Sequence, residues 1–384
     1  MIKTDVCIIG AGPSGASTSL MLSKYKVPHY IIDKATFPRD KTCGDGLILY
    51  AYKSLKELGL LERFLKHPKF IHSKKINLHL NNTLRVTFKE SEKRDMVISY
   101  GKRIDFDFFL VNHLSEQYAI KEFGNAVKKI EAHPDGYMVR LKDGKEILSK
   151  VIVGADGIQS IVSRKLGQNT VDRSKVSTFI SAYFKDVNGL SLKNEAEIRI
   201  VYKGIPLFFY VFPLADNQVN VTLGGNAKKI QAYNINLKEE VTTILTSHPK
   251  VVDKFKDAEQ VNAWRGWGIP YQFRKQKAYG NRFLLVGDAA GLANAFYKEG
   301  VGTGMMSGII CAKKIAECIR ENDFSEERLA SYQKELQKEF GKLLRFSELV
   351  LRLAKFKQLF FLTVRVLKNR LERKSVGVIK RRSY

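Results

Sequence analysis

A glycine-rich turn near the start of the chain constrains its fold more than any other feature. The apolar run DVCIIG leads into AGPSG and a helix-forming stretch, and a second apolar run, HYIID, follows. Gly10 permits a tight turn, Gly12 lets a phosphate approach the backbone, and Gly15 lets helix and strand pack closely. Asp33 ends the second run, where a carboxylate can accept hydrogen bonds from an adenosine ribose. This order predicts a βαβ unit with parallel strands that binds a dinucleotide.

Composition indicates a globular chain long enough for two domains. Its 384 residues are 44% apolar and 27% charged. The four cysteines have neither disulfide nor zinc spacing, so we expect no metal site and a reducing, cytoplasmic location. We expect neither a transmembrane helix nor a signal peptide, because no run of eighteen uncharged apolar residues occurs and the first strand begins near Asp5.

The pattern along the chain predicts an interrupted domain. β-like segments with alternating polarity dominate from about 175 to 270, and a nucleotide-type strand and turn then return as RFLLVGDAAG. A helix is expected near 105–121. We assign residues 1–74, 96–172 and 277–330 to the nucleotide-binding domain, 75–95 and 173–276 to a mostly antiparallel second domain, and 331–384 to a basic helical segment.

Two later turns place acidic residues directly after apolar strands. VIVGADG carries Asp156, and RFLLVGDAAG carries Asp288, which can hydrogen-bond a polyol chain. A helix that opens near Gly300 would direct its N–H groups at an electron-rich ring edge. Such donors stabilise negative charge on a reduced flavin in the same way as an oxyanion.

In this order, the glycine turn, GADG and GDAAG resemble the glutathione-reductase-type FAD fold in its para-hydroxybenzoate-hydroxylase-like branch. FPRDKTCGDGL resembles the segment that distinguishes geranylgeranyl reductases within it. LFFYVFPLADNQVNVTLGG, residues 207–225, resembles that family's substrate-pocket signature, with Tyr210 at the usual tryptophan position, and RIDFDFFL resembles its Arg-x-x-Phe-Asp-x-x-Leu. The resemblance implies an α/β fold: a Rossmann-like FAD-binding domain, an antiparallel β substrate domain inserted in it, and a helical C-terminal extension.

The resemblance also implies an FAD site built from many segments. FAD contacts are expected at Gly10, Gly12, Ser14, Gly15, Asp33, Lys34, Cys43, Gly44, Gly46, Arg103, Ala126, Asp156, Asp288, Gly300 and Val301. The substrate pocket is expected at Phe208, Tyr210, Phe212 and Pro213. Cys43 is expected beside the flavin ring, where its thiol either donates a proton to a substrate carbon after hydride transfer or only packs against the ring.

The implied function is an FAD-dependent reductase of C=C bonds in an apolar, isoprenoid-like or lipid substrate. NAD(P)H or another reductant would reduce the FAD. The alternative is a flavin-dependent monooxygenase, hydroxylase-like or halogenase-like, that acts on an aromatic or polyketide-like substrate. The halogenases' Trp-x-Trp-x-Ile-Pro segment is absent from the sequence.

The C-terminal segment is strongly basic within a chain of net charge +26. Residues 340–384 contain thirteen lysines and arginines against Glu348 and Glu372. Apolar residues recur there at helical spacing: Phe346, Leu349, Val350, Leu353, Phe356 and Phe360. Two interpretations stay open: the helix lies on an anionic membrane surface, which makes the protein peripheral to a membrane, or it packs on the flavin domain with its charges in water. A nucleic-acid-binding role ranks last, because it leaves three flavin motifs unexplained.

Overall fold

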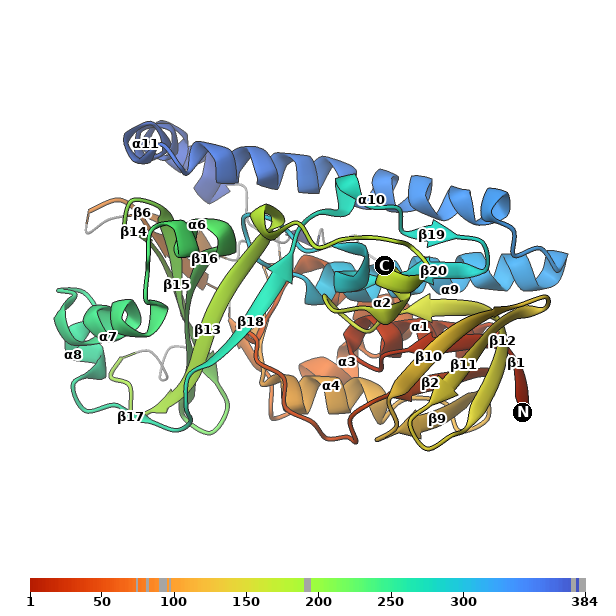
Figure 1. Cartoon of the computed structure of the whole chain (residues 1–384). Coiled ribbons are helices and arrows are strands. Elements are labelled where there is room, and N and C mark those ends of the chain that lie inside the picture. Colours follow the sequence, from red (N-terminus) through yellow and green to blue (C-terminus); the bar gives the residue numbers. More distant parts are fainter. Residues whose placement is uncertain are drawn as a thin grey trace.

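The computed structural model describes residues 1–73, 75–80, 83–89, 95–96, 98–189, 195–373 and 378–379. Two large sheets lie side by side, and the long helix α10 (Glu326–Leu353) extends along both (Figure 1). The mixed α/β architecture, with an antiparallel sheet inserted between parts of a nucleotide-binding unit, confirms the predicted fold class.

The first sheet contains the glycine turn. β1 (Ile2–Ile9) pairs in parallel with β2 (His29–Asp33) on one side and with β12 (Glu146–Gly154) on the other. α1 (Pro13–Lys24) connects β1 to β2, so the predicted βαβ unit is confirmed. The other strands of this sheet are β9 (Ala119–Phe123), β10 (Val127–His133), β11 (Gly136–Leu141), β19 (Tyr279–Gly280) and β20 (Phe283–Leu285).

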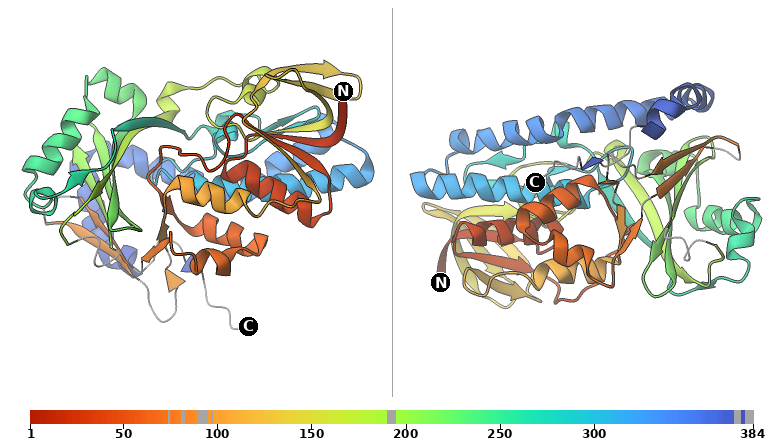
Figure 2. Two further views of the ribbon diagram at one scale, coloured as in Figure 1. Left: turned by 90° about the horizontal axis from the view of Figure 1, so that it is seen from below. Right: turned by 180° about the vertical axis from the view of Figure 1, so that it is seen from behind.

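Helices cover the first sheet and meet through small residues. α9 (Val301–Glu321) packs on α1, and a Cβ atom on Gly308 would collide with the Ser14 carbonyl, so this close crossing needs a glycine. Viewed from behind, α9 and α10 lie side by side (Figure 2). The remaining helices of this part are α2 (Leu49–Leu58), α3 (Leu61–Leu65), α4 (Arg103–Val111), α5 (Ile161–Lys165) and the short 3-10 turn η4 (Gly287–Ala290).

The helix expected over 105–121 is wrong in its second half. α4 ends at Val111, and residues 119–123 form β9, which pairs in parallel with β2 from His29↔Ala119 onward. The open edge of β2 offers backbone partners, and this tertiary pairing overrides the local helical tendency.

The second sheet is antiparallel except where β14 pairs in parallel with β5. Its spatial order is β17-β13-β16-β15-β14-β5-β6, and β18 also pairs with β13. The strands are β5 (Lys75–His79), β6 (Arg85–Lys89), β13 (Val176–Lys185), β14 (Ala196–Tyr202), β15 (Pro206–Leu214), β16 (Gln218–Asn226), β17 (Glu259–Gln260) and β18 (Arg265–Pro270). The helices α6 (Ala227–Ala232), α7 (Leu237–Ser247) and α8 (Val252–Phe255) follow β16.

Two small sheets complete the description. β3 (Gly46–Leu47), β8 (Ile98–Tyr100) and β4 (Ile71–Ser73) form one, which carries the cysteine segment. β7 (Asp95–Met96) and β21 (Val378–Ile379) form the other. In the described part of the chain, no helix combines the length and apolar character needed to cross a bilayer.

The C-terminal segment forms two helices where the sequence predicted one. α10 begins at Glu326, so the boundary at residue 331 falls inside it, and α11 (Lys357–Arg373) follows a break. The Tyr202 hydroxyl donates to the Ala354 carbonyl at 2.9 Å, and Ala354 is fully buried. This bond satisfies a carbonyl at the end of α10 and fixes that end against β14.

Candidate functional site

A cavity of about 860 Å³ extends from the glycine turn to the second sheet. Its walls come from the loops after β1, β2 and β12, from the start of α9, and from the inner face of the second sheet. α10 and α11 close it along one side with Phe346, Val350 and Phe360 among others. The cavity therefore joins a nucleotide-type cradle to a large apolar chamber.

The glycine turn is shaped for a phosphate. Gly10 has φ +103°, and a Cβ atom there would collide with the carbonyl of Ala155. Gly12 is the N-cap of α1 and provides no side-chain cap, which leaves first-turn N–H groups available to an anion. Asp33 accepts from Ala11 N at 2.8 Å and from Ala35 N at 2.9 Å, so its carboxylate is fixed at the cavity wall with lone pairs left for a ribose.

Most of the residues expected to contact FAD line this one cavity. They are Gly10, Gly12, Ser14, Asp33, Lys34, Cys43, Gly44, Gly46, Arg103, Ala126, Asp156, Asp288, Gly300 and Val301. Gly15 is the exception. Its Cβ would collide with the Gly10 carbonyl, so it serves the close packing of α1 on the turn and does not face the cavity.

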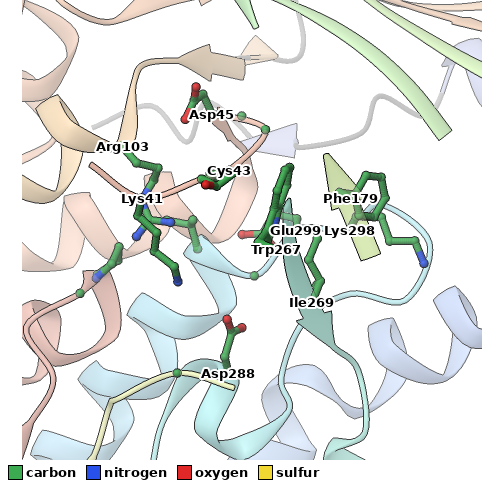
Figure 3. Close-up of a pocket in the computed structure, with 18 of the residues that line it drawn as sticks. Lys41, Cys43, Asp45, Arg103, Phe179, Trp267, Ile269, Asp288, Lys298 and Glu299 are labelled. Carbon is green, nitrogen blue, oxygen red and sulfur yellow. The ribbon is translucent and has the colours of Figure 1, made fainter. Parts of the chain in front are cut away.

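Two half-buried carboxyl groups face the cradle from later turns. Asp156 Oδ2 accepts from Ile161 N at 2.7 Å, whereas its Oδ1 has no hydrogen-bond partner among the described residues. Burial raises the pKa of Asp288, and Lys41 and Arg103 oppose that rise. Asp288 lies across the cavity from Cys43 (Figure 3). These carboxyl groups, one with an acceptor atom left free in the described part of the chain, fit the hydroxyl-rich parts of FAD, whereas the free N–H groups at the start of α1 fit its phosphates.

Cys43 is half-buried and lies on the loop before β3. Burial raises the pKa of its thiol, and the charge of Arg103, which also hydrogen-bonds the sulfur, lowers it. The net direction is upward, so the thiol is protonated at neutral pH. A neutral thiol beside a cation can release a proton and leave a stabilised thiolate.

Arg103 is held by a buried carboxylate. Its Nε and Nη2 donate to the two oxygens of Asp107 at 2.6 and 2.8 Å, one helical turn along α4. Arg39 reaches the same carboxylate at 3.1 Å. Arg103 and Asp107 are 4% and 1% exposed, so this pair is shielded from water. It fixes the guanidinium that faces Cys43.

At the start of α9, one of the N–H groups that were expected to face a flavin ring is engaged by a side chain of the protein. Glu299 accepts a hydrogen bond from Gly302 N, so this N–H is already engaged, while Gly300 and Val301 still line the cavity. Burial raises the pKa of Glu299 to about 7 and lowers the pKa of Lys298 to about 7. Lys298 donates to the Ala295 carbonyl and lies over Tyr271 at 4.9 Å. Sequence reasoning missed both residues, although YKEG directly precedes the predicted helix start.

The apolar chamber is built on alternate residues of β15. Phe208, Tyr210 and Phe212 line it, with Tyr210 and Phe212 stacked at 5.3 Å between ring centroids. Pro213 does not line it, which corrects that prediction: side chains alternate along a strand, and Pro213 follows Phe212 onto the face that Phe209 and Val211 share in a second core cluster.

Sequence reasoning also missed part of the aromatic wall. Phe179 of β13 and Trp267 and Ile269 of β18 line the chamber, and the Phe179 and Trp267 rings lie 5.7 Å apart (Figure 3). The alternation in RGWGIP is the signal that could have identified Trp267 and Ile269, because every second residue of a strand faces one side. In the described residues, no group of three metal-ligating side chains is placed to hold an ion.

Comparisons with known proteins agree with this geometry. The sequence profile of a family described as "FAD binding domain" matches residues 3–347. A menaquinone reductase of Mycobacterium tuberculosis is 26% identical over 328 residues, which cover 81% of this chain and 76% of that protein. Digeranylgeranylglycerophospholipid reductase 3 of Methanosphaera stadtmanae is 27% identical over 357 residues, with 88% and 84% covered.

Other similar proteins include a halogenating enzyme and a reductase-like protein of known structure. A 1H-pyrrole-2-carbonyl-(peptidyl-carrier protein) chlorinase of Pseudomonas fluorescens is 24% identical over 362 residues, with 86% and 79% covered. The crystal structure of a geranylgeranyl bacteriochlorophyll reductase-like protein from Thermoplasma acidophilum superposes with a TM-score of 0.85 at 19% identity, and covers 99% of this chain and 94% of that one. The predicted resemblance to the geranylgeranyl reductase family is confirmed.

Proposed function

Because the chain belongs to the FAD binding domain family, we propose that it is an FAD-dependent reductase of C=C bonds in an apolar, isoprenoid-like or lipid substrate. Bound FAD, reduced by NAD(P)H or another donor, supplies the hydride. We keep the division into an FAD-binding domain, a substrate domain and a C-terminal segment as part of this proposal, with the boundaries given above except that the last segment begins with α10 at Glu326.

The continuity of the cavity carries the proposal. The cradle of Gly10, Asp33 and Asp288 opens directly into the chamber walled by Tyr210 and Trp267, so a bound flavin and an apolar substrate would share one continuous cavity. An apolar wall favours a hydrocarbon chain because its burial contributes roughly 0.8 kcal/mol per CH₂ group. Similar proteins named as reductases of menaquinone and of digeranylgeranylglycerophospholipid support a lipid substrate.

Reduction of an isolated double bond also requires a proton, and Cys43 is our candidate donor. Its thiol is neutral, lines the cavity and faces Arg103, which stabilises the thiolate after the proton has left. One alkene carbon receives the hydride and the neighbouring carbon receives the thiol proton, so the double bond becomes a single bond. A positioned acid of this kind typically contributes 10²–10⁴-fold in rate.

The test uses the flavin-loaded protein under anaerobic conditions. The flavin is reduced with dithionite, an isoprenoid alkene such as geranylgeraniol is added, and flavin reoxidation and saturated product are measured. We expect both signals, and in Cys43→Ala a rate lower by about 10²-fold or more with the flavin retained. Failure of geranylgeraniol and of isoprenoid lipids to reoxidise the flavin would refute the proposal.

A monooxygenase is the second candidate, and the similar chlorinase favours it. In that case a substrate would be oxidised at the same cavity with consumption of oxygen. An oxygen electrode separates the two. Oxygen uptake that depends on an aromatic substrate, together with no anaerobic alkene reduction, would support the monooxygenase.

For the C-terminal helices we propose contact with an anionic membrane surface. The predicted apolar stripe divides between two faces: Phe360 is only 3% exposed and packs inward, whereas Phe346, Leu349 and Phe356 are 58%, 62% and 65% exposed. α11 adds the exposed residues Leu359, Leu362, Val366 and Leu367. The exposed basic residues among them are Lys342, Arg345, Arg352, Lys355, Lys357 and Arg365.

The positive charge of α10 and α11 indicates which kind of membrane surface they would bind. Uncharged apolar side chains interleaved with cations are complementary to a bilayer that carries anionic headgroups. Phe346 lines the cavity and is also exposed, so the same surface borders the space where the substrate would bind. We expect the protein to sediment with vesicles of phosphatidylglycerol and phosphatidylcholine, and much less with phosphatidylcholine alone.

The matched variants are Leu362→Ser with Val366→Ser on the exposed face, and Thr242→Ala with Thr246→Ala on the exposed side of α7. The first pair should reduce sedimentation severalfold and the second should not. Equal sedimentation of both variants with anionic vesicles would refute the membrane surface.

A further inference from the structure

A second carboxyl group lies on the cysteine loop. Asp45 is only 1% exposed, lines the cavity, and has φ +61°, the left-handed conformation that turns the chain sharply two residues after Cys43. Its backbone N–H hydrogen-bonds the Cys43 sulfur. A buried acid is thus built into the same turn as the thiol.

Asn220, from β16 of the second sheet, ties the two residues together. Its Nδ2 donates to the Cys43 carbonyl at 2.9 Å and to Asp45 Oδ2 at 2.7 Å. Its amide oxygen accepts from Ser181 Oγ at 2.8 Å and from Thr222 Oγ1 at 2.7 Å. Two hydroxyl donors on the oxygen fix the amide orientation, so the NH₂ group must face the loop.

The surroundings of Asp45 favour its neutral form. Burial raises the pKa of Asp45 to about 7, against hydrogen bonds from Asn220 and Tyr183 and the charge of Arg103, which lower it. Its Oδ1 is buried without a hydrogen-bond partner that meets normal geometry among the described residues. Tyr183 is half-buried, and Lys102 Nζ lies 5.0 Å from its ring centre. Tyr183 is thus a half-exposed neighbour of the buried acid.

We propose that Asp45 is the proton reservoir that reprotonates Cys43 after each reduction. This inference rests on the proposed function. The Cys43 S–H bond breaks as the alkene carbon gains its proton, the Asp45 carboxylic acid then transfers its proton to the thiolate, and solvent protonates the Asp45 carboxylate past Tyr183. No further oxidant or reductant is required, because each step after hydride transfer moves only a proton.

The first test does not depend on turnover. In flavin-loaded protein, Cys43 is alkylated with iodoacetamide from pH 6 to 10; Cys7, Cys311 and Cys318 are buried, and Cys43→Ser gives the blank rate. Ionised Asp45 opposes thiolate formation, so Asp45→Asn should move the alkylation profile down by about one pH unit, a roughly tenfold faster reaction near pH 8.

The matched control is Asp216→Asn, which removes the same charge from an exposed turn after β15. Its profile should equal the wild type. Flavin content reports whether Asp45→Asn folds, and Asn220→Ser, which keeps the acid but removes its tether, provides a second variant with a displaced profile. A wild-type profile in both variants would overturn the proposal.

The second test is repeated turnover of the alkene with excess dithionite, in which Cys43 must be reprotonated before each new cycle. The wild-type rate should fall as the pH rises through about 7, because the donating form of Asp45 is lost. Asp45→Asn should be at least tenfold slower without this dependence, and Asp45→Glu should regain it. An unchanged pH profile in Asp45→Asn would refute the reservoir. If the wild type reduces no alkene, the proposed function fails, while the alkylation result still reports the coupling of the two residues.

Discussion

Asp107→Asn offers a direct measurement of what holds the cation beside Cys43. The carboxylate receives both arms of Arg103 at 2.6 and 2.8 Å and Arg39 at 3.1 Å, and its side chain is inaccessible to solvent. Loss of one partner of a buried ion pair costs about 3–5 kcal/mol, because a charge is left uncompensated. The amide oxygen can still accept one hydrogen bond, worth about 1 kcal/mol, so we expect the free energy of unfolding to fall by about 2–4 kcal/mol.

The control is an exposed pair of the same chemistry. Arg265 Nη1 lies 2.8 Å from Asp40 Oδ2, but these side chains are 57% and 36% exposed. Asp40→Asn should therefore cost about 0–1 kcal/mol. Equilibrium urea unfolding of flavin-free protein measures both, because bound FAD would add stability by mass action.

A third variant removes both partners of the Arg103–Asp107 ion pair, so that no unpaired charge is left behind. Replacement of both partners, Arg103→Met with Asp107→Leu, should be less destabilising than Asp107→Asn alone, since no buried charge remains unpaired. If Asp107→Asn loses no more stability than Asp40→Asn, solvent or another group compensates Arg103 and the reasoning is refuted.

Two further variants test the cradle and the start of α9. Gly10→Ala should bind little flavin and unfold at a lower urea concentration than Gly144→Ala. Both positions have positive φ, which costs an alanine about 1–2 kcal/mol, but only at Gly10 would the new Cβ atom also collide with the backbone. Equal losses of stability in the two variants would contradict the crowding at the turn. Glu299 has its pKa raised from 4.5 to about 7, so wild-type stability should fall by about 3 kcal/mol as the pH rises between these values. Glu299→Gln should lack this loss, and parallel pH dependences of the two proteins in urea unfolding would argue against it.

The parts of the fold that depend on local signals were predictable. The turn glycines are predictable because the backbone there requires glycine. Asp33, Asp156 and Asp288 are predictable because each stands at or directly after the end of an apolar strand. Of these residues, all except Gly15 line one cavity. Gly15 follows the packing role that its spacing predicted.

What the sequence did not reveal depends on tertiary partners. β9 forms because the edge of β2 is open, and the end of α10 is fixed to another sheet by the bond from Tyr202 to Ala354. Asp45 belongs to the cysteine segment FPRDKTCGDGL, but only its hydrogen bond with Asn220, 175 positions away, shows that it is tied to Cys43. Long-range contacts of this kind leave no local pattern.

The length of α10 limits how the cavity can open. Its 28 residues extend about 42 Å. It contacts α9 and β19 beside the first sheet, while near its other end Glu348 meets Lys175 at 3.3 Å and the following Ala354 accepts from Tyr202. A hinge rotation between the sheets would break one of these attachments or bend the helix. Displacement of α11 would uncover Phe360 and Val364 and leave both sheets in place, but it would break the contact of α11 with β6, including the Thr87 N–H to Glu372 bond at 3.0 Å.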